Sequence, residues 1–237
     1  MNEKQIRDRA LEIRETVARA AERSGRSGFD VFVLPITKGH PTGVLEAVVR
    51  AGFEAIGENR VAEAETKLAE LGRAGVRWHM VGHLQRNKAG RAIHTFDVIE
   101  SVDSVRLARR LHSEAGKAER SSVPILAQVN AGAEEQKSGL DPAQLVDAIG
   151  EMLDLGHIRV QGLMTMAPFT TEERVLRRTF TTARECLARC QAELPGFGGR
   201  TLSMGMSNDF EIAVEEGSTE VRLGTVLLGE RPEGRWI

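Results

Sequence analysis

Short apolar runs alternate with helix-forming segments along nearly the whole chain, and this alternation limits the possible folds more than any other feature. Eight of the runs have the length and composition of buried strands. They are Val31–Ile36, Phe53–Gly57, Trp78–Val81, Val98–Ser101, Ile125–Val129, Val160–Met164, Thr201–Met204 and Glu220–Leu223. Strands separated by helices are typical of βα units, in which the strands pair in parallel.

One amphipathic helix is predicted between each pair of successive strands, and another before the first. These segments are Ile6–Arg23, Pro41–Val49, Val61–Leu71, Asn87–His94, Ser104–Glu119, Asp141–Leu153, Glu172–Glu193 and Phe210–Glu216. The pattern predicts an α/β fold, a single (β/α)8 TIM barrel with an extra N-terminal helix. A doubly wound open sheet is the alternative, but it would have fewer strands and a glycine-rich first turn, and no such motif occurs.

Composition fits one barrel domain over residues 1–237. The net charge of −2 and a pI near 6.3 argue against nucleic-acid binding and against a membrane-surface role. The N-terminal residues lack the apolar segment of a signal peptide, and no apolar run is long enough to span a membrane, so a cytoplasmic protein is expected. Cys186 and Cys190 lie in a predicted helix, and we expect partly buried packing residues rather than a disulfide.

Polar and small residues follow the predicted strands. In (β/α)8 barrels the functional groups come from the loops at the C-terminal ends of the strands. Here those positions are Thr37-Lys38, Gly57-Glu58-Asn59, Gly82-His83, Ser101, Asn130, Met166-Ala167-Pro168, Met206-Ser207-Asn208 and Gly224-Thr225. We expect the functional site among them. Within the first strand, Pro35 cannot donate a ladder hydrogen bond, so a β-bulge is expected there.

Lys38 is the one lysine of six that directly ends a buried apolar strand. Partial desolvation there should lower the pKa of its ammonium group and favour the free amine that a Schiff base requires. The alternative interpretation is a lysine at the rim that pairs with Glu58. Lys67, by contrast, is expected on an exposed, charged helix face.

Small residues and hydroxyl groups follow the seventh and eighth strands, in Ser203–Ser207 and Arg222–Thr225. In barrels these two loops commonly bind phosphate through backbone N–H groups and a short helix N-terminus. Ser207 lies where it would help to cap a helix that begins near Phe210. A lysine facing such a phosphate site indicates pyridoxal 5'-phosphate (PLP).

The remaining titratable residues give weaker signals. His79 and His83 are four residues apart, but no third ligand lies near them in the sequence, so no metal site is predicted. His79 is expected to be a hydrogen-bonded core residue. Asp97, Glu100 and Asp103 are expected to be solvated loop residues.

Seven motifs, in order along nearly the whole chain, resemble those of the pyridoxal phosphate homeostasis proteins, also called PLP-binding or proline synthase co-transcribed proteins. They are Thr37-Lys38, Gly57–Val61, Trp78–Lys88, Lys137–Gly139, Gly162–Pro168, Leu202–Ser207 and Val221–Thr225. The resemblance implies a barrel like the N-terminal domain of alanine racemase, with PLP held as an internal aldimine. It also implies control of intracellular PLP and of amino- and keto-acid balance, without established enzymatic turnover.

The resemblance also implies roles for individual residues. Lys38 matches the Schiff-base lysine, and Arg222 matches the residue that faces the pyridine nitrogen. The phosphate cradle is matched by Ser203, Ser207, Gly224 and Thr225. Asn59 and His83 fall on positions that line the cofactor.

Two functions remain open at this stage. The first is a carrier or regulator that binds PLP and releases it to apo PLP-dependent enzymes. The second is a PLP-dependent catalyst on amino acids, such as a racemase, decarboxylase or aldolase. The resemblance implies that a racemase of the alanine type needs a tyrosine from a second domain, whereas this chain has no tyrosine and no length left for that domain. We expect a monomer that binds neither nucleic acid nor membranes.

Overall fold

Eight parallel strands form a barrel in the computed structural model, which describes residues 1–134 and 138–231. The strands are β1 (Phe32–Pro35), β2 (Ala55–Glu58), β3 (Arg77–Met80), β4 (Val98–Val102), β5 (Val123–Gln128), β6 (Ile158–Met164), β7 (Thr201–Ser203) and β8 (Glu220–Leu223). The sheet order is β1-β8-β7-β6-β5-β4-β3-β2. A bridge between Ile36 and Gly57 joins β1 to β2, where the Thr37 N–H donates to the Gly57 carbonyl over 3.0 Å. The sheet therefore closes, which confirms the barrel and excludes the open sheet.

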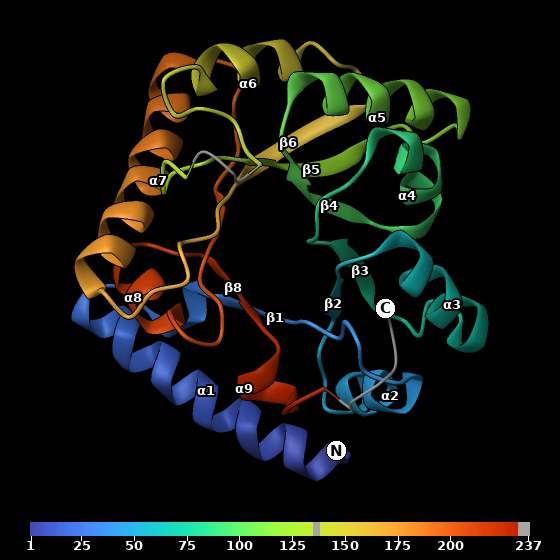
Figure 1. The fold of residues 1–237 in the computed structure, drawn as a ribbon, viewed down its shortest axis with the longest axis vertical. Helices are drawn as coiled ribbons and strands as arrows, with labels where there is room; N and C mark the ends of the chain where they lie inside the picture. The colour runs from blue at the N-terminus through green and yellow to red at the C-terminus, as the bar shows by residue number, and fades with distance from the viewer. Residues whose placement is uncertain (135–137, 232–237) are drawn as a thin grey trace.

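Helices surround the barrel on its outer side (Figure 1). They are α1 (Glu3–Arg23), α2 (Thr42–Arg50), α3 (Val61–Leu71), α4 (Ala89–Thr95), α5 (Val105–Lys117), α6 (Leu145–Leu153), α7 (Glu173–Glu193), α8 (Phe210–Glu215) and α9 (Thr225–Leu228), with short 3₁₀ turns at Gly28–Asp30 and Arg86–Lys88. The sequence did not predict α9, which directly follows β8. No helix within the described residues is both long and apolar enough to cross a membrane.

Pro35 lies in register with Leu223, so the predicted β-bulge is wrong. The physical reason is the side of the strand on which the missing N–H falls. The N–H groups of Phe32 and Ile36 donate towards β8, whereas that of Thr37 donates towards β2. Because successive N–H groups point to opposite sides of a strand, an N–H group at Pro35 would point towards β2. Within the described residues, β1 and β2 are joined by one bridge, so the missing donor at Pro35 removes little pairing from the sheet.

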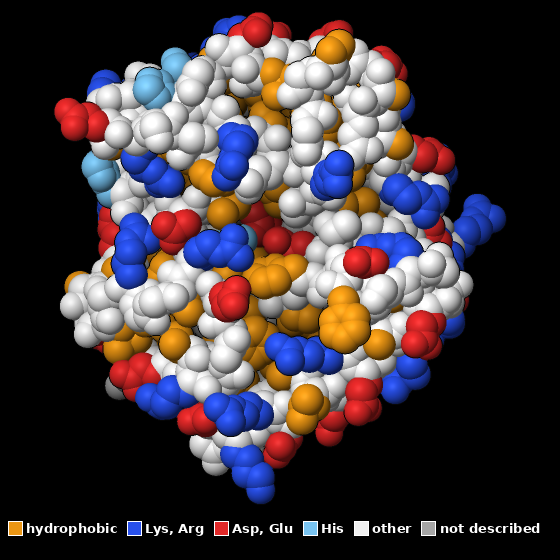
Figure 2. Space-filling view, turned by 180° about the vertical axis from the view of Figure 1, so that it is seen from behind, with side chains coloured by type: hydrophobic (Ala, Val, Ile, Leu, Met, Phe, Trp, Pro, Cys, Tyr) orange, Lys and Arg blue, Asp and Glu red, His pale blue; other side chains and the backbone are white. Residues whose placement is uncertain are grey.

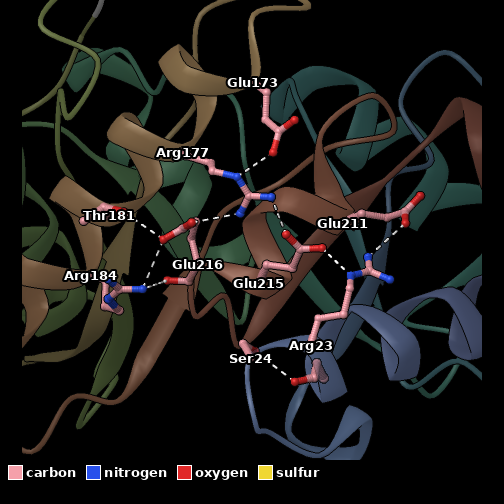
Figure 3. A network of polar contacts seen from close by, with 10 residues as sticks. Arg23, Ser24, Glu173, Arg177, Thr181, Arg184, Glu211, Glu215 and Glu216 are labelled. Atoms are coloured by element: carbon pink, nitrogen blue, oxygen red, sulfur yellow. Dashed lines mark hydrogen bonds and ion pairs between the residues drawn. The ribbon is translucent and has the colours of Figure 1, made fainter.

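The N-terminal helix α1 packs against α2, α8 and α9 through a buried apolar face that includes Ile6, Ile13 and Val17. Ion pairs add to this contact (Figure 3). Arg23 on α1 and Arg177 on α7 both bind Glu215 on α8, each over 2.5 Å. Exposed pairs of this kind each contribute about 0–1 kcal/mol, so the apolar face is the main attachment of α1.

The barrel interior is divided into an apolar part and a charged part. Leu34, Ile36, Ala55 and Val81 form a small apolar cluster near β1 and β2. Buried charged and polar side chains of β3, β4, β7 and β8 fill the other part. Outside the barrel, Cys186 and Cys190 are free and fully buried, which confirms that they pack in the core.

Candidate functional site

Three neighbouring strands bring the predicted site residues to one edge of the barrel. β8 lies between β1 and β7, and their C-terminal ends lead into Lys38, Gly224-Thr225 and the loop that contains Ser207. Because parallel strands end on the same side, these residues face a common space. The charge of Arg222 on β8 lowers the pKa of Lys38, as expected for groups that share this space.

Lys38 lies in a half-buried turn immediately after β1. Within the described part of the chain, no hydrogen bond or ion pair joins its ammonium group to another residue. Burial lowers the pKa of Lys38, and the charges of Arg231 and Arg222 lower it further, against the opposing charges of Glu58 and Glu63. Lys38 thus has no partner among the described residues, and its lowered pKa increases the share of the free amine.

The alternative pairing of Lys38 with Glu58 is wrong, because Glu58 binds a different lysine. Lys67 was expected on an exposed face, but it is buried, and its Nζ lies 2.7 Å from Glu58 Oε1 and 2.8 Å from Glu63 Oε1. Its third partner is the Thr37 carbonyl oxygen at 2.8 Å. We call Lys67, Glu58 and Glu63 the Lys67 cluster. It lies directly beside the turn that carries Lys38.

Glu58 is held at the centre of the Lys67 cluster. Its Oε1 also accepts a hydrogen bond from the Thr37 hydroxyl at 2.5 Å, whereas its Oε2 is buried and has no partner in the part of the chain that the structure describes. Burial raises the pKa of this carboxyl to about 7, although the charge of Lys67 opposes the change. Glu58 therefore titrates near neutral pH.

Arg222 is buried in β8 and held in place through its guanidinium group. Nη1 donates to Ser203 Oγ at 2.7 Å, and Nη2 donates to the Thr165 carbonyl oxygen at 2.8 Å. Ser203 Oγ in turn donates to Glu100 Oε2 at 2.8 Å. Two of the five N–H donors of an arginine are thus used to fix the plane of the group.

Glu100 was predicted to be a solvated loop residue, and this is wrong. It lies in β4 without exposed surface, and its Oε1 is 2.7 Å from His79 Nδ1. The predicted strand Val98–Ser101 contains Glu100, so the error concerns its exposure, because periodicity alone does not show that a carboxylate on a strand faces the inside of a closed barrel. The prediction that His79 is a hydrogen-bonded core residue is confirmed. We call His79, Glu100, Ser203, Glu220 and Arg222 the Glu100 cluster.

The Glu100 cluster reaches the N-terminal end of the barrel, opposite Lys38. A cavity of about 360 Å³ opens there, and His79 and Glu220 are among the residues that line it. Figure 2 shows this side of the molecule, with acidic side-chain atoms on the floor of a central hollow. His79 Nε2 and Glu220 Oε1 are buried and have no hydrogen-bond partner among the described residues. The sequence spacing gave no signal that would group these two residues.

The loops after β7 and β8 are joined by a hydrogen bond. Ser207 Oγ accepts from the Val226 N–H at 3.3 Å, in the first turn of α9. The N-cap predicted just before Phe210 is present, but Asp209 rather than Ser207 occupies it, and the Asp209 side chain accepts a hydrogen bond from the Met206 N–H. Ser207 therefore lies beside the N-terminus of the short helix after β8, next to Thr225.

The four residues matched to the phosphate cradle differ in their surroundings. Ser207, Gly224 and Thr225 lie around the start of α9. Ser203 lies within β7, has no exposed surface, and uses its hydroxyl for Glu100 and Arg222. The structure therefore associates Ser203 with the guanidinium group rather than with the open loop.

Asn59 and His83 follow β2 and β3. A Cβ atom on Gly82 would lie 2.2 Å from the Asn59 carbonyl oxygen, so only glycine permits this close approach. The His83 side chain is 59% exposed, and its Nδ1 lies 3.2 Å from Asp103 Oδ2 and 3.5 Å from Ser138 Oγ. Asp103 is thus a partner of His83 rather than a solvated residue. The Lys137 of the matched motif lies outside the described residues.

Sequence reasoning missed the roles of Lys67 and Glu63. A usable signal was present, because the two residues are four apart on α3, a spacing at which side chains of opposite charge meet. The β2 motif that contains Glu58 ends directly before this helix. Taken together, these two observations would have predicted that Glu58, Glu63 and Lys67 lie close to one another.

Comparisons with known proteins agree with this geometry. A family model described as the alanine racemase N-terminal domain matches residues 12–232. The pyridoxal phosphate homeostasis protein of Aquifex aeolicus is 36% identical over 228 residues, which cover 94% of this chain and 97% of the relative. PipY of Synechococcus elongatus PCC7942 is 36% identical in a structure without PLP, which covers 94% of this chain and 100% of PipY with a TM-score of 0.85.

A structure of PipY with PLP bound has a TM-score of 0.83 to this chain. Alanine racemase from Corynebacterium glutamicum is 15% identical, with a TM-score of 0.72, and the match covers 100% of this chain and 64% of that protein. This last likeness shows the fold alone, a barrel like that of alanine racemase.

Proposed function

The chain belongs to the family of pyridoxal phosphate homeostasis proteins, and on this premise we propose that it binds PLP and holds it covalently through Lys38. Its role is then intracellular PLP homeostasis, in which the protein keeps a reactive cofactor and releases it to other proteins. The observation that carries the proposal is the state of Lys38, a half-buried amine with a lowered pKa and no partner among the described residues.

The residues at this end of the barrel fit PLP in their chemistry. An aldehyde requires a free amine, which Lys38 supplies. A phosphate requires N–H and hydroxyl donors, and Ser207, Gly224 and Thr225 surround a helix N-terminus that offers them. Asn59 and His83, at the ends of β2 and β3, complete the proposed lining.

PLP supplies an electron sink for amino-acid chemistry, most strongly when its ring nitrogen is protonated. We propose that Arg222 faces that nitrogen. A guanidinium group is permanently charged and can only donate hydrogen bonds, so it disfavours a second positive charge on the ring. Ser203 and the Thr165 carbonyl hold the guanidinium group in this orientation. The residues therefore favour holding the cofactor over using it.

The test is to reduce the purified, PLP-loaded protein with borohydride and to map the labelled peptide. The label is expected on Lys38, and Lys38→Ala is expected to lose it. Lys88→Ala is the matched control, because Lys88 is half-buried near the same end of the barrel, after β3, but does not end a strand. A label on Lys88, or a wild-type protein that takes up no PLP, would overturn the proposal.

We propose in addition that the bound PLP passes to apo PLP-dependent enzymes in the cytoplasm. The exposed side chain of His83 supports this, because it shows that the rim of the site is open to solvent. The measurement is the recovery of activity of an apo-enzyme mixed with the loaded protein, beside turnover of a panel of amino acids. Turnover at rates of ~1–10³ s⁻¹ without any transfer would make the protein a catalyst instead.

A further inference from the structure

The turn that carries Lys38 is fixed at both of its peptide groups. On one side, the Thr37 carbonyl oxygen accepts from Lys67 Nζ at 2.8 Å and from the His40 N–H at 3.1 Å. On the other side, the Gly39 N–H donates to Glu63 Oε1 at 2.5 Å. Lys67 and Glu63 both belong to α3, so side chains of one helix form hydrogen bonds with the main chain immediately before and after Lys38.

Lys67 is the centre of this arrangement. An ammonium group has three protons, and here each has an acceptor, namely Thr37 O, Glu58 Oε1 and Glu63 Oε1. Hydrogen bonds to charged groups are roughly twice as strong as neutral ones. Lys67 also holds Glu63 at the Gly39 N–H, because the same Oε1 atom accepts from both groups. The hydrogen bonds that fix this turn therefore depend on the buried charge of Lys67.

Packing alone does not require a charge at this position. Well-packed apolar side chains often replace a buried ion pair at no cost in stability. An apolar side chain could not bind the Thr37 carbonyl oxygen, and it would not hold the Glu63 carboxylate against Gly39. Compared with an apolar side chain at this position, Lys67 thus adds one thing, which is a fixed position of the main chain at Lys38.

We propose that Lys67 is a positioning residue for Lys38: through the Thr37 carbonyl and Glu63 it fixes the two peptide groups that flank Lys38 and so directs that amine towards the cofactor aldehyde. The inference rests on the proposed function, in which Lys38 holds PLP. Because reaction between two groups depends steeply on their prior orientation, a loosened turn slows attachment without weakening the separate phosphate contacts.

The test compares Lys67→Met with Lys117→Met in the full-length apo-protein. Lys117 is a matched control, since it also pairs with a glutamate on its own helix but is exposed. The first measurement is the rate of PLP attachment by absorbance, with borohydride mapping. The second is the affinity for 4'-deoxypyridoxine 5'-phosphate, which has the ring and the phosphate but no aldehyde.

Lys67→Met is expected to slow attachment at least about tenfold while affinity for the deoxy analogue stays within about twofold of wild type. Lys117→Met is expected to match wild type in both. A wild-type attachment rate in folded Lys67→Met would overturn the inference, and so would a parallel loss of analogue affinity, which indicates general damage to the site. Circular dichroism checks that the variants are folded.

If Lys67→Met does not fold, Glu63→Leu decides the question, because Lys67 then keeps Glu58 as its partner while the Gly39 N–H is released. Attachment is expected to slow at least about fivefold, again with unchanged analogue affinity, and Glu70→Leu on the exposed side of α3 is the control. A wild-type rate in Glu63→Leu overturns the inference. Failure of the proposed function is distinguishable, because wild type itself would then carry no label on Lys38.

Discussion

The Lys67 cluster and the Glu100 cluster are both buried groups of charged side chains, but the first fixes a segment of main chain and the second fixes a side chain. In the Lys67 cluster, an ammonium group binds a main-chain carbonyl and two carboxylates, and the result is a fixed turn. In the Glu100 cluster, a carboxylate and a serine hold a guanidinium group, and the result is a fixed side chain. The comparison indicates that the barrel positions the Lys38 amine by hydrogen bonds to the main chain around it. It positions the Arg222 guanidinium group by a hydrogen bond with Ser203, which Glu100 holds in turn.

The carboxyl groups of the two clusters also differ in their pKa values. Burial raises the pKa of Glu58 to about 7, because its lysine partner does not offset the loss of water completely. Burial acts on Glu100 as well, but His79 and Arg222 outweigh it and lower the pKa of that carboxyl. The proton of this pair of carboxyl groups is held instead by Glu220, whose pKa is raised by burial and by the charge of Glu100. Thus Glu58 titrates near neutrality, while Glu100 stays ionised.

The largest effect on stability is expected from Lys67→Met. Removal of the ammonium group leaves Glu58 and Glu63 buried without their counter-charge, and such losses cost about 3–5 kcal/mol. The measurement is the free energy of unfolding in urea at pH 7. Lys117→Met removes an exposed pair and is expected to change this value by less than about 1 kcal/mol. Equal losses in the two variants would contradict the view that burial of the charges sets the cost.

The next effect is the dependence of stability on pH that Glu58 gives to the Lys67 cluster. The pKa of Glu58 is raised in the folded state, so folding takes up a proton, and this contribution to stability is complete below about pH 4.5. It is lost as the pH rises through about 7. Between pH 5 and 8.5, wild type is expected to lose on the order of 2–3 kcal/mol more than Glu58→Gln, whose amide does not titrate. Parallel unfolding curves for the two proteins would contradict the raised pKa.

The difference between the clusters also shows where sequence reasoning succeeds. The periodicity predicted the eight strands, and α3 begins and ends at the predicted residues, Val61 and Leu71. The position of Lys38 at the end of β1 was likewise predictable, because it depends only on the end of an apolar run. These features are local, so a single segment contains all the information they require.

Features that depend on contact between distant segments were not predictable. Glu100 was expected to be solvated although it falls within the predicted strand Val98–Ser101, whereas the barrel buries it opposite Ser203, on a strand that is not its neighbour. Lys67 was placed on a charged helix face, although its partners come from the turn after β1, from β2 and from α3. The spacing of Glu63 and Lys67 marks them as a pair, but their burial follows from contacts with the barrel that no local pattern encodes.

The third prediction concerns the relay inside the Glu100 cluster. Ser203→Ala removes the hydroxyl that joins Arg222 to Glu100 and leaves a buried N–H and a buried carboxylate oxygen without this partner. The expected loss in free energy of unfolding is about 1–3 kcal/mol. Urea unfolding at pH 7 gives the value. A loss below about 0.5 kcal/mol would mean that Arg222 binds Glu100 equally well without the serine.

The smallest effect on stability is expected from Ser207→Ala, and it separates the two serines that the sequence placed in one phosphate cradle. Ser207 gives up one hydrogen bond of 3.3 Å to the Val226 N–H, in a half-buried loop that water can reach. The loss in free energy of unfolding is therefore about 0.5–1 kcal/mol. PLP retention is expected to weaken by about 1–3 kcal/mol, or roughly 5- to 150-fold in Kd, because a charged phosphate loses a donor.

Ser203→Ala is expected to show the reverse, with normal affinity for inorganic phosphate and lower stability, because its hydroxyl is already bound within the barrel. Isothermal titration with phosphate, beside urea unfolding, measures both quantities in both variants. If Ser203→Ala weakens phosphate binding as much as Ser207→Ala does, the two serines share one ligand, and the separation between the open loop and the Glu100 cluster is wrong. If neither variant changes phosphate binding, the phosphate lies elsewhere on the barrel and α9 does not hold it.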